Sequence, residues 1–459
     1  MQQAALQATE KKRKWVFAKK PSGSLYKKRQ WVGYSLLLFL FASPFIKIKG
    51  EPFLLFGVLE RKFVIFGKVF WPEDLYVFVF GMLIVLVCIV LFTAVYGRVW
   101  CGWTCPQTIF MELIFRPIEY WIEGDRTQQL KNRRNKHKWE VKRKKILKLI
   151  VFYIISFFIS NIFLAYLIGA DALFEIITSP VSQHLGGFIS ILAFSFVFFF
   201  VFAYVRDIVC THICPYGRLQ SVLIDNDTTV IAYNYNRGEP RGRKSKSKPE
   251  AELGDCIDCN LCVQVCPTGI DIREGLQMEC VSCTACIDAC DDVMVKLNRP
   301  KRLIGFYTPS ELLENKTASR KNKRAIAYTA LLVVLIAIFG VLIFTRSDVS
   351  GTILRAKGST YQLRDDGTVT NLYNLNLINK TNKNMDIQLE PNDSRFKIQV
   401  VNPHLNLQKS ESSKMSLFLI LPKEEVEDYK TNVRIKIMDE EKVLKEIKTT
   451  FIAPIGLVK

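Results

Sequence analysis

The sequence predicts a multi-domain membrane protein in three parts: a bundle of five transmembrane helices, a small cysteine-rich α+β module, and a carboxyl-terminal all-β sandwich of immunoglobulin-like type. Three observations predict this fold class. Five stretches are apolar enough to cross a bilayer, 12 of the 13 cysteines fall in four short motifs, and residues 346–459 read as short strands. With 459 residues, 49% of them hydrophobic, the chain suits a membrane protein with soluble parts.

The transmembrane bundle is predicted from hydropathy, because a spanning helix needs about 20 apolar residues. The apolar stretches are residues 32–48, 76–96, 149–169, 188–205 and 325–345. A basic leader precedes the first stretch, and no small-residue cleavage site follows it, so we expect an uncleaved anchor. The run "FLLFGVLERKFVIFGKVFW" between the first two stretches is expected to lie at the membrane interface or to re-enter the membrane.

Charge sets the expected orientation. Lys and Arg crowd into residues 98–148 and 320–324, whereas residues 170–187 contain neither. By the positive-inside rule, the amino terminus and the long segment after the fourth stretch face the cytoplasm, and the carboxyl terminus faces the periplasm. We therefore expect a multi-pass protein of the bacterial inner membrane. The expected domains are a basic leader (1–30), a four-helix region (31–214), a cytoplasmic linker with the cysteine-rich module (215–324), a fifth helix (325–345) and a periplasmic domain (346–459).

The cysteine-rich module contains two copies of Cys-x2-Cys-x2-Cys-x3-Cys, which is the bacterial ferredoxin pattern for two 4Fe–4S clusters. In two-cluster ferredoxins the fourth cysteine of each run ligates the other cluster, because three thiolates on one tight loop reach three corners of the cluster. This predicts one cluster on Cys256, Cys259, Cys262 and Cys290, and a second on Cys280, Cys283, Cys286 and Cys266.

Zinc is the alternative metal, but zinc sites usually use two separated pairs of ligands. Pro267 follows the first run, whereas Asp291 follows the second. Ahead of the module, residues 236–255 are rich in charge, Pro and Gly, and are expected to form an exposed linker.

Two Cys-x-x-x-Cys-Pro elements, "CGWTCP" and "CTHICP", follow the second and fourth apolar stretches. Their cysteines are Cys101, Cys105, Cys210 and Cys214. Because proline removes a helical hydrogen bond, each element should bend or end near its cysteine pair. The thiols could bind a soft ion, with Cu(I) as the leading candidate, or cycle between dithiol and disulfide.

Free cysteines commonly pack as small apolar residues, and a single such element would be interpreted that way. Two copies at the same predicted membrane face, both joined to a redox module, favour a functional role. His212 lies inside the second element and is a further candidate ligand.

The motifs "CGWTCPQT", "CTHICPYGRLQ", "RGEPRG" and "CIDCNLCVQVCPTGIDIREGLQMECVSCTACIDACDDVM" together resemble the CcoG/FixG/RdxA family of membrane-bound polyferredoxins. The resemblance extends from about residue 31 to the end, through "RKFVIFGKVFWPEDLY", "RPIEYWIEGDR" and "DDGTVTNLYNLNLINKT". It implies an accessory protein for assembly of cbb-type cytochrome c oxidase that reduces Cu(II) to Cu(I). On this analogy Cys101, Cys105, Cys210 and Cys214 handle copper or relay electrons, and the partners are copper ions, an unidentified electron donor, and oxidase assembly factors or a copper transporter.

The carboxyl-terminal segment contains β-rich runs such as "RFKIQVV" and "NVRIKIMDEE", and about seven strands in ~110 residues fit an immunoglobulin-like sandwich. It contains no cysteine. We expect an interaction module; a solubilising cap without a specific partner is the alternative.

Three functions stay open: a copper-reducing electron-transfer enzyme, a quinol-linked electron conduit to another reductase, and a non-catalytic scaffold whose clusters sense redox state. Nucleic-acid binding is not expected despite the net charge of +20, because the basic residues lie beside apolar stretches and no basic-aromatic recognition module is present.

Overall fold

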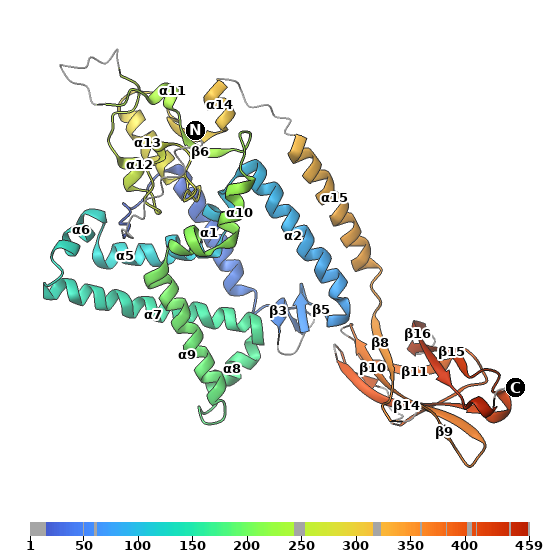
Figure 1. Ribbon diagram of the computed structural model, residues 1–459. Helices are drawn as coiled ribbons and strands as arrows, with labels where there is room; N and C mark the ends of the chain where they lie inside the picture. The colour runs from blue at the N-terminus through green and yellow to red at the C-terminus, as the bar shows by residue number, and fades with distance from the viewer. Residues whose placement is uncertain are drawn as a thin grey trace. The chain divides into compact units, whose positions relative to one another are not determined.

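The computed structural model describes residues 15–48, 50–58, 62–242, 253–314, 323–358, 360–381, 383–401, 406–409, 411–439 and 442–457. The chain forms two compact units (Figure 1). Unit 1 comprises Met1–Ser43, Gly81–Ala165 and Ala170–Ile336. Unit 2 comprises Pro44–Phe80, Tyr166–Gly169 and Ala337–Lys459.

Four helices among the described residues are long and apolar enough to span a membrane. They correspond to four of the five predicted stretches: α2 (Leu75–Tyr96), α7 (Trp139–Ile168), α9 (Leu185–Phe200) with the π-helical turn Val201–Val205, and α15 (Lys323–Phe344). Helix α7 begins ten residues earlier than predicted. Its first residues are Lys-, Arg- and Glu-rich, and these straight-chain residues continue a helix well although they lower hydropathy.

The bounds predicted for the first span are wrong. Helix α1 covers Ser24–Ala42 instead of residues 32–48. It starts among basic residues that hydropathy disfavours, and Pro44 follows its end. Lys47–Ile48 (β1) then pairs with Glu51–Pro52 (β2) as a short antiparallel ladder. Helix α1 is not one of the four candidate spans among the described residues.

The helical core of unit 1 is aromatic. Phe115 stacks on Phe202 with ring centroids 4.5 Å apart and meets Phe152 edge-on at 4.9 Å. These rings belong to the π-helical segment Phe110–Phe115, the turn after α9, and α7. Unit 1 also contains five short helices: α3 (Val99–Trp103), α4 (Pro106–Ile109), α5 (Arg116–Glu123), α6 (Arg126–Arg134) and α10 (Pro215–Leu223).

The cysteine-rich module is an α+β fold built on one antiparallel pair, β6 (Val230–Tyr233) with β7 (Ile304–Tyr307). The module also contains four helices: α11 (Tyr235–Gly238), α12 (Leu261–Gln264), α13 (Ala285–Lys296) and α14 (Pro309–Glu314). Helix α13 packs against β7 and against α12. Its core combines aliphatic side chains such as Ile231 and Ile287 with the cysteines themselves.

The expected linker is partly packed. A Cβ on Gly254 would lie 2.5 Å from the carbonyl carbon of Gly238, so the backbone segments around these two glycines are in contact. Arg237 also pairs with Asp255 at 2.6 Å. Residues 236 and 239–241 are exposed, as expected for a linker, whereas residues 237, 238, 242 and 253–255 are buried or partly buried, because backbone contacts are not visible in composition; residues 243–252 lie outside the described residues.

In unit 2, the run expected at the membrane interface forms a three-stranded antiparallel sheet: β3 (Leu54–Gly57), β4 (Lys62–Ile65) and β5 (Lys68–Phe70). Leu55, Val64 and Val69 are buried on one face. The strand residues are mostly apolar, but burial alternates along β3 and β5, as expected for strands with one covered face. Helix α8 (Ala170–Thr178), which belongs to unit 1, lies between α7 and α9 in the chain.

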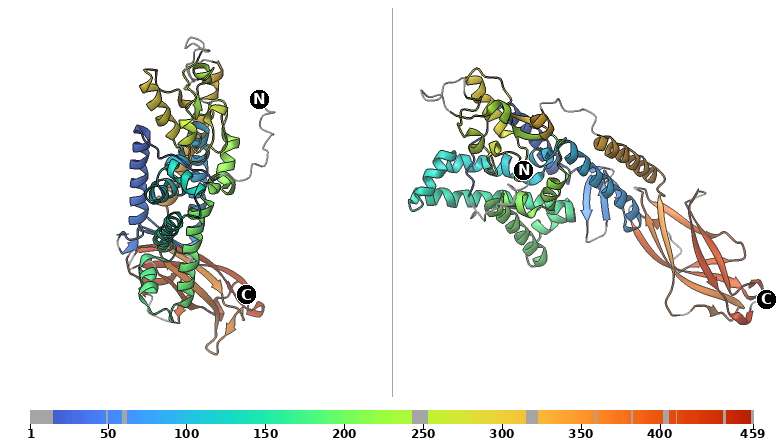
Figure 2. Two further views of the ribbon diagram at one scale, coloured as in Figure 1. Left: turned by 90° about the vertical axis from the view of Figure 1, so that its left-hand side faces the viewer. Right: turned by 45° about the horizontal axis from the view of Figure 1, so that its top comes forward.

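The carboxyl-terminal region is all-β and has nine strands among the described residues (Figure 2). One sheet has the order β12-β14-β10-β8, with β9 also paired to β10; the other has the order β13-β11-β15-β16. The strands are β8 (Val349–Arg355), β9 (Gln362–Leu363), β10 (Thr368–Asn379), β11 (Met385–Pro391), β12 (Lys397–Val400), β13 (Asn406–Leu407), β14 (Ser412–Pro422), β15 (Lys430–Asp439) and β16 (Lys442–Ile452). Both sheets contribute to one apolar core, as in a sandwich.

Candidate iron–sulfur and thiol sites

Two cavities in the cysteine-rich module are lined by cysteines. Cavity A is bordered by Cys256, Cys259, Cys262 and Cys290. Cavity B is bordered by Cys266, Cys280, Cys283 and Cys286, and also by Cys262, which borders both cavities. These four-cysteine sets coincide with the two ligand sets expected from the sequence, including the exchange of the fourth cysteine between runs. The ligand assignment itself stays a prediction.

Local backbone geometry explains how short loops present three thiols each. Asp258 and Asn260 in the first run, and Ser282 and Thr284 in the second, adopt positive φ angles between 53° and 67°. Such left-handed residues turn the chain sharply and are uncommon outside glycine. Helix α13 then places Cys286 and Cys290 one turn apart, so one lines cavity B and the other cavity A.

The donor set fits iron–sulfur clusters. Without a metal, burial raises the pKa of Cys283 and of Cys290 to about 12 each. Charged thiolates in such surroundings are costly unless a cation is bound, so the cysteines suit a group that binds them as thiolates. Among the described residues, no three His, Cys, Asp or Glu side chains are arranged to hold a single metal ion.

The two thiol elements break their helices as the sequence predicts. Helix α3 ends at Trp103, and Cys105 becomes the N-cap of α4 with Pro106 as its first residue. In the second element a π-helical turn ends at Ile213, and Cys214 caps α10 with Pro215 next. A proline is tolerated at the first helical position because the N–H it lacks there has no partner in the helix.

The two thiol elements lie close enough for their thiols to influence one another. Burial raises the pKa of Cys101 to about 11, and the nearby thiols of Cys105 and Cys214 act in the same direction. Burial likewise raises the pKa of Cys210 to about 12, with contributions from Cys105 and Cys101. Each of these two cysteines is therefore influenced by a thiol of the opposite element.

A buried glutamine supports this thiol group. The Cys101 thiol donates to Gln220 Oε1 at 3.2 Å. Gln220 is fully buried, and its Nε2 has no hydrogen-bond partner among the described residues. A buried amide with an unused donor is unusual in native proteins.

The thiol elements pack directly on the second cysteine run. Cys101 and Cys210 belong to one apolar cluster with Val281, Cys283 and Cys286. The backbone is close as well, since a Cβ on Gly102 would lie 2.9 Å from Ser282 O and nearer still to Val281 O.

Two arginines fasten this contact. Arg98, from the loop after α2, donates to the carbonyls of Met278 and Gly217 and so joins the second run to α10. Arg29 of α1 donates to Gly102 O at 2.7 Å. Both side chains are buried, so cavity B is fixed next to the thiols.

Three family profiles match parts of the chain. Residues 205–309 match the family described as "4Fe-4S dicluster domain", and residues 78–126 match "4Fe-4S binding domain". Residues 339–454 match the family described as "IG-like fold at C-terminal of FixG", whose description presents FixG as a proposed oxidoreductase. The first two matches also contain the second and the first thiol element, respectively.

Two proteins of Cereibacter sphaeroides are similar over most of the chain. Protein RdxB is 34% identical over 394 residues, which cover 82% of this chain and 82% of RdxB. Protein RdxA is 35% identical over 391 residues, which cover 82% of this chain and 81% of RdxA. The chain belongs to the RdxA/RdxB/FixG family. It is accordingly an iron–sulfur protein with a dicluster region and an immunoglobulin-like carboxyl-terminal region.

Two further comparisons cover less of this chain. The nitrogen fixation protein FixG of Rhizobium meliloti is 33% identical over 318 residues, which cover 67% of this chain and 59% of FixG. A solved FixG-related protein from Vibrio parahaemolyticus is 17% identical, covers 24% of this chain and 100% of its own, and has a TM-score of 0.22.

The sequence did not predict that residues 19–26 contact the cysteine-rich module. Asp288, between two cysteines of the second run, accepts from the backbone N–H of Leu25 at 3.2 Å and of Tyr26 at 2.8 Å. Lys19 N also donates to Gln264 O at 2.7 Å. The leader therefore joins the cysteine-rich module to α1, and no sequence signal links residues so far apart.

His212 is exposed, and its Nδ1 lies 2.7 Å from the Thr211 hydroxyl. It borders a separate open cavity with Asp207 and Glu279, whereas the four thiols do not border that cavity. The structure therefore does not bring His212 together with the thiol group, and its role as a ligand stays a prediction.

Proposed function

We propose that this chain is a membrane-bound electron-transfer protein that reduces Cu(II) to Cu(I) at the thiols of Cys101, Cys105, Cys210 and Cys214, for assembly of a cbb-type cytochrome c oxidase. The observation that carries the proposal is the single apolar cluster in which Cys101 and Cys210 pack against Cys283 and Cys286. This contact supports the proposal because thiols are soft ligands and Cys283 and Cys286 are predicted cluster ligands. The chain would then be a cupric reductase, with copper as its substrate.

The clusters, when bound, supply one-electron transfer between an external reductant and this region. The remaining chemistry belongs to the chain's own side chains. Thiolates are soft ligands that select Cu(I), so a site made of them stabilises the product of the one-electron reduction. A half-turn of the Gln220 amide would bring its unpartnered Nε2–H to the Cys101 sulfur once the thiol proton has left.

We propose five membrane crossings: the four apolar helices α2, α7, α9 and α15, and in addition α1. Residues between α2 and α7 and between α9 and α15 lie on the same side if the four apolar helices all cross. The amino-terminal end of α1 is bonded to Asp288, within the second of these segments. The loop before α2 belongs on the opposite side, so α1 has to cross to connect them. With the positive-inside rule, the thiols and cavities face the cytoplasm and the β-sandwich faces the periplasm.

The test is copper reduction by purified, reduced protein, followed with a Cu(I)-specific chromophore. A variant with Cys101→Ser and Cys210→Ser should lose most of this activity while keeping its iron, because neither residue is a predicted cluster ligand. Cys88→Ser, at an exposed position in α2, is the matched control and should retain full activity. Equal rates in the double variant and the unchanged protein would remove the thiols from the mechanism.

Iron analysis distinguishes a third cluster from a copper site. Two clusters give about eight Fe per chain. The match of residues 78–126 to a "4Fe-4S binding domain" includes Cys101 and Cys105, so a third cluster on the four thiols is the competing arrangement. About twelve Fe per chain, falling to about eight in the double variant, would show that the four thiols bind an iron–sulfur cluster and not copper.

Two other functions have separate signatures. Oxidation of the reduced protein by a quinone, independent of copper, would favour a quinol-linked conduit. Normal oxidase maturation with all eight ferredoxin cysteines replaced would favour a scaffold.

A further inference from the structure

The two cysteine runs are supported in different ways. In the second run, the left-handed residues Ser282 and Thr284 are buried, and the Gly102 backbone lies against Ser282. In the first run, Asp258 and Asn260 have the same backbone conformation, but both are exposed. The loop of cavity A therefore needs another support.

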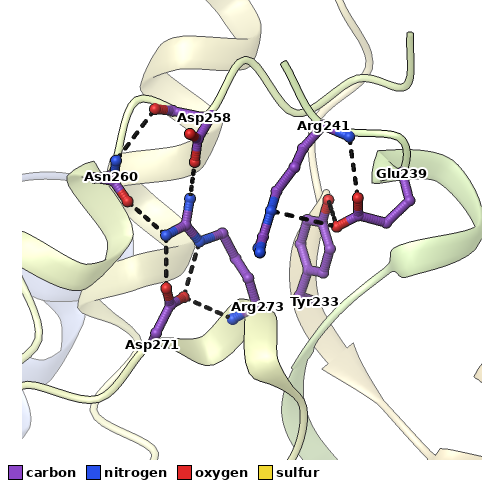
Figure 3. Close-up of polar contacts among 7 residues, drawn as sticks. All are labelled: Tyr233, Glu239, Arg241, Asp258, Asn260, Asp271 and Arg273. Atoms are coloured by element: carbon purple, nitrogen blue, oxygen red, sulfur yellow. Dashed lines mark hydrogen bonds and ion pairs between the residues drawn. The ribbon is translucent and has the colours of Figure 1, made fainter. Parts of the chain in front are cut away.

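Arg273 provides that support from 13 and 15 residues further along the chain (Figure 3). Its guanidinium donates to the side-chain oxygens of Asp258 and Asn260, through Nη1 and Nη2 respectively. The Arg273 side chain is only 7% exposed, whereas the Asp258 side chain is 48% exposed. One buried fork thus holds both left-handed residues that flank Cys259.

Asp271 fixes the fork in turn. Its carboxylate accepts from Arg273 Nε at 2.8 Å and from Nη2 at 2.6 Å, and it also accepts from the Arg273 backbone N–H at 3.0 Å. A guanidinium is planar and offers five donors in fixed directions, so it can bind three partners at once. A lysine ammonium has three donors on one nitrogen but no planar fork, so it could not make the same set of paired contacts.

Arg273 also borders cavity A directly, together with Tyr233 and the four cysteines. Cavity B has no arginine among its lining residues in the described part of the chain. The fork is therefore specific to the first of the two predicted clusters.

We propose that Arg273 is a positioning residue for the cluster of cavity A, holding Asp258 and Asn260 in the left-handed conformation that directs Cys256, Cys259 and Cys262 into the cavity. The proposal rests on the two-cluster interpretation of this module and is independent of copper reduction. Its physical basis is that left-handed conformations are unfavourable for residues with a Cβ and persist only where surrounding contacts hold them.

The test is anaerobic purification of the full-length Arg273→Gln variant, with iron and sulfide analysis and EPR of the reduced protein. We expect iron to fall by about half, from about eight to about four Fe per chain. The EPR spectrum should change from two interacting clusters to one isolated cluster. Arg241→Gln is the matched control: Arg241 lies beside the same region in Figure 3 but pairs with Glu239, and this variant should keep both clusters.

A glycine rescue separates positioning from general instability. Glycine adopts positive φ without strain. Asp258→Gly with Asn260→Gly, added to Arg273→Gln, should therefore restore the lost iron if the arginine acts by holding these conformations. Full iron in Arg273→Gln alone would overturn the proposal. If that variant loses both clusters, recovery in the glycine variant supports the proposal and failure to recover overturns it. Iron content is read without copper, so these outcomes do not depend on the proposed reductase activity.

Discussion

Gly102→Ala adds one carbon atom, the Cβ, to the contact between the first thiol element and the second cysteine run. The added Cβ would lie 2.9 Å from Ser282 O and closer to Val281 O, whereas ordinary contact begins at 3.4 Å. Both neighbours are backbone atoms, which cannot rotate away, so the two segments have to separate by ~1 Å to restore ordinary contact with Val281 O.

The cost can be bounded from this geometry. Overpacking a close-fitting contact costs about 1–3 kcal/mol, and the upper half of that range applies because the neighbours are backbone. Alanine is a better helix former than glycine by at most about 1 kcal/mol, which offsets part of the loss in α3. We therefore expect the contact to weaken by about 1–2 kcal/mol, or roughly 5- to 30-fold in its opening equilibrium.

Hydrogen exchange of residues 278–284 measures this opening, because exchange reports local free energies. Exchange in this segment should accelerate by roughly the same factor, and reduction of Cu(II) should slow. Gly186→Ala is the control, since a Cβ there meets nothing within 4 Å. Unchanged exchange in Gly102→Ala would refute the packing of thiol element and cluster loop described above.

Three further substitutions have defined outcomes. Asp288→Ala removes the acceptor at the start of α1 and should lower stability by about 1 kcal/mol, read as a lower Tm than that of Asp292→Ala. Asp74→Asn leaves Arg346 and Lys380 facing a neutral buried amide and should cost about 3–5 kcal/mol, seen as faster proteolysis of the β-sandwich. Glu119 is buried, which raises its pKa, but Arg206 and Lys148 outweigh burial and lower the pKa to about 2. The stability it contributes is therefore complete above about pH 4.5 and lost as pH falls through about 2, so the penalty of Glu119→Gln should be large near pH 6 and small at pH 2; an equal penalty at both would contradict this.

Cysteine spacing, proline positions and hydropathy predicted those parts of the structure that depend on residues near each other in the sequence. The ferredoxin runs have a fixed spacing because three thiols must leave one tight loop, and the structure gathers the eight cysteines in the two expected sets. The helix breaks before Pro106 and Pro215 follow from the missing N–H of proline. Four of the apolar helices were predicted because hydropathy over about 20 residues is a property of the segment itself.

Contacts between distant residues were not predictable in this way. Gln220 meets Cys101 from 119 residues away, and Asp288 meets Tyr26 from 262 residues away. Arg273 is an ordinary charged residue in the sequence, and only the fold shows that it is buried against the first cysteine run. The start of α1 was missed because its first turns are basic, while the three-stranded sheet in unit 2 was missed because an apolar run beside a membrane resembles an interfacial segment.

The central claim is that the thiol elements and the cysteine-rich module occupy the same side of the membrane and form one site. Single cysteines at Leu219, in α10, and at Glu274, beside the first run, are exposed reporters of the two regions. Inverted and right-side-out vesicles are treated with a membrane-impermeant maleimide, and modified peptides are identified by mass spectrometry. Both reporters should react in inverted vesicles only. Labelling of the two reporters from opposite faces would contradict the account.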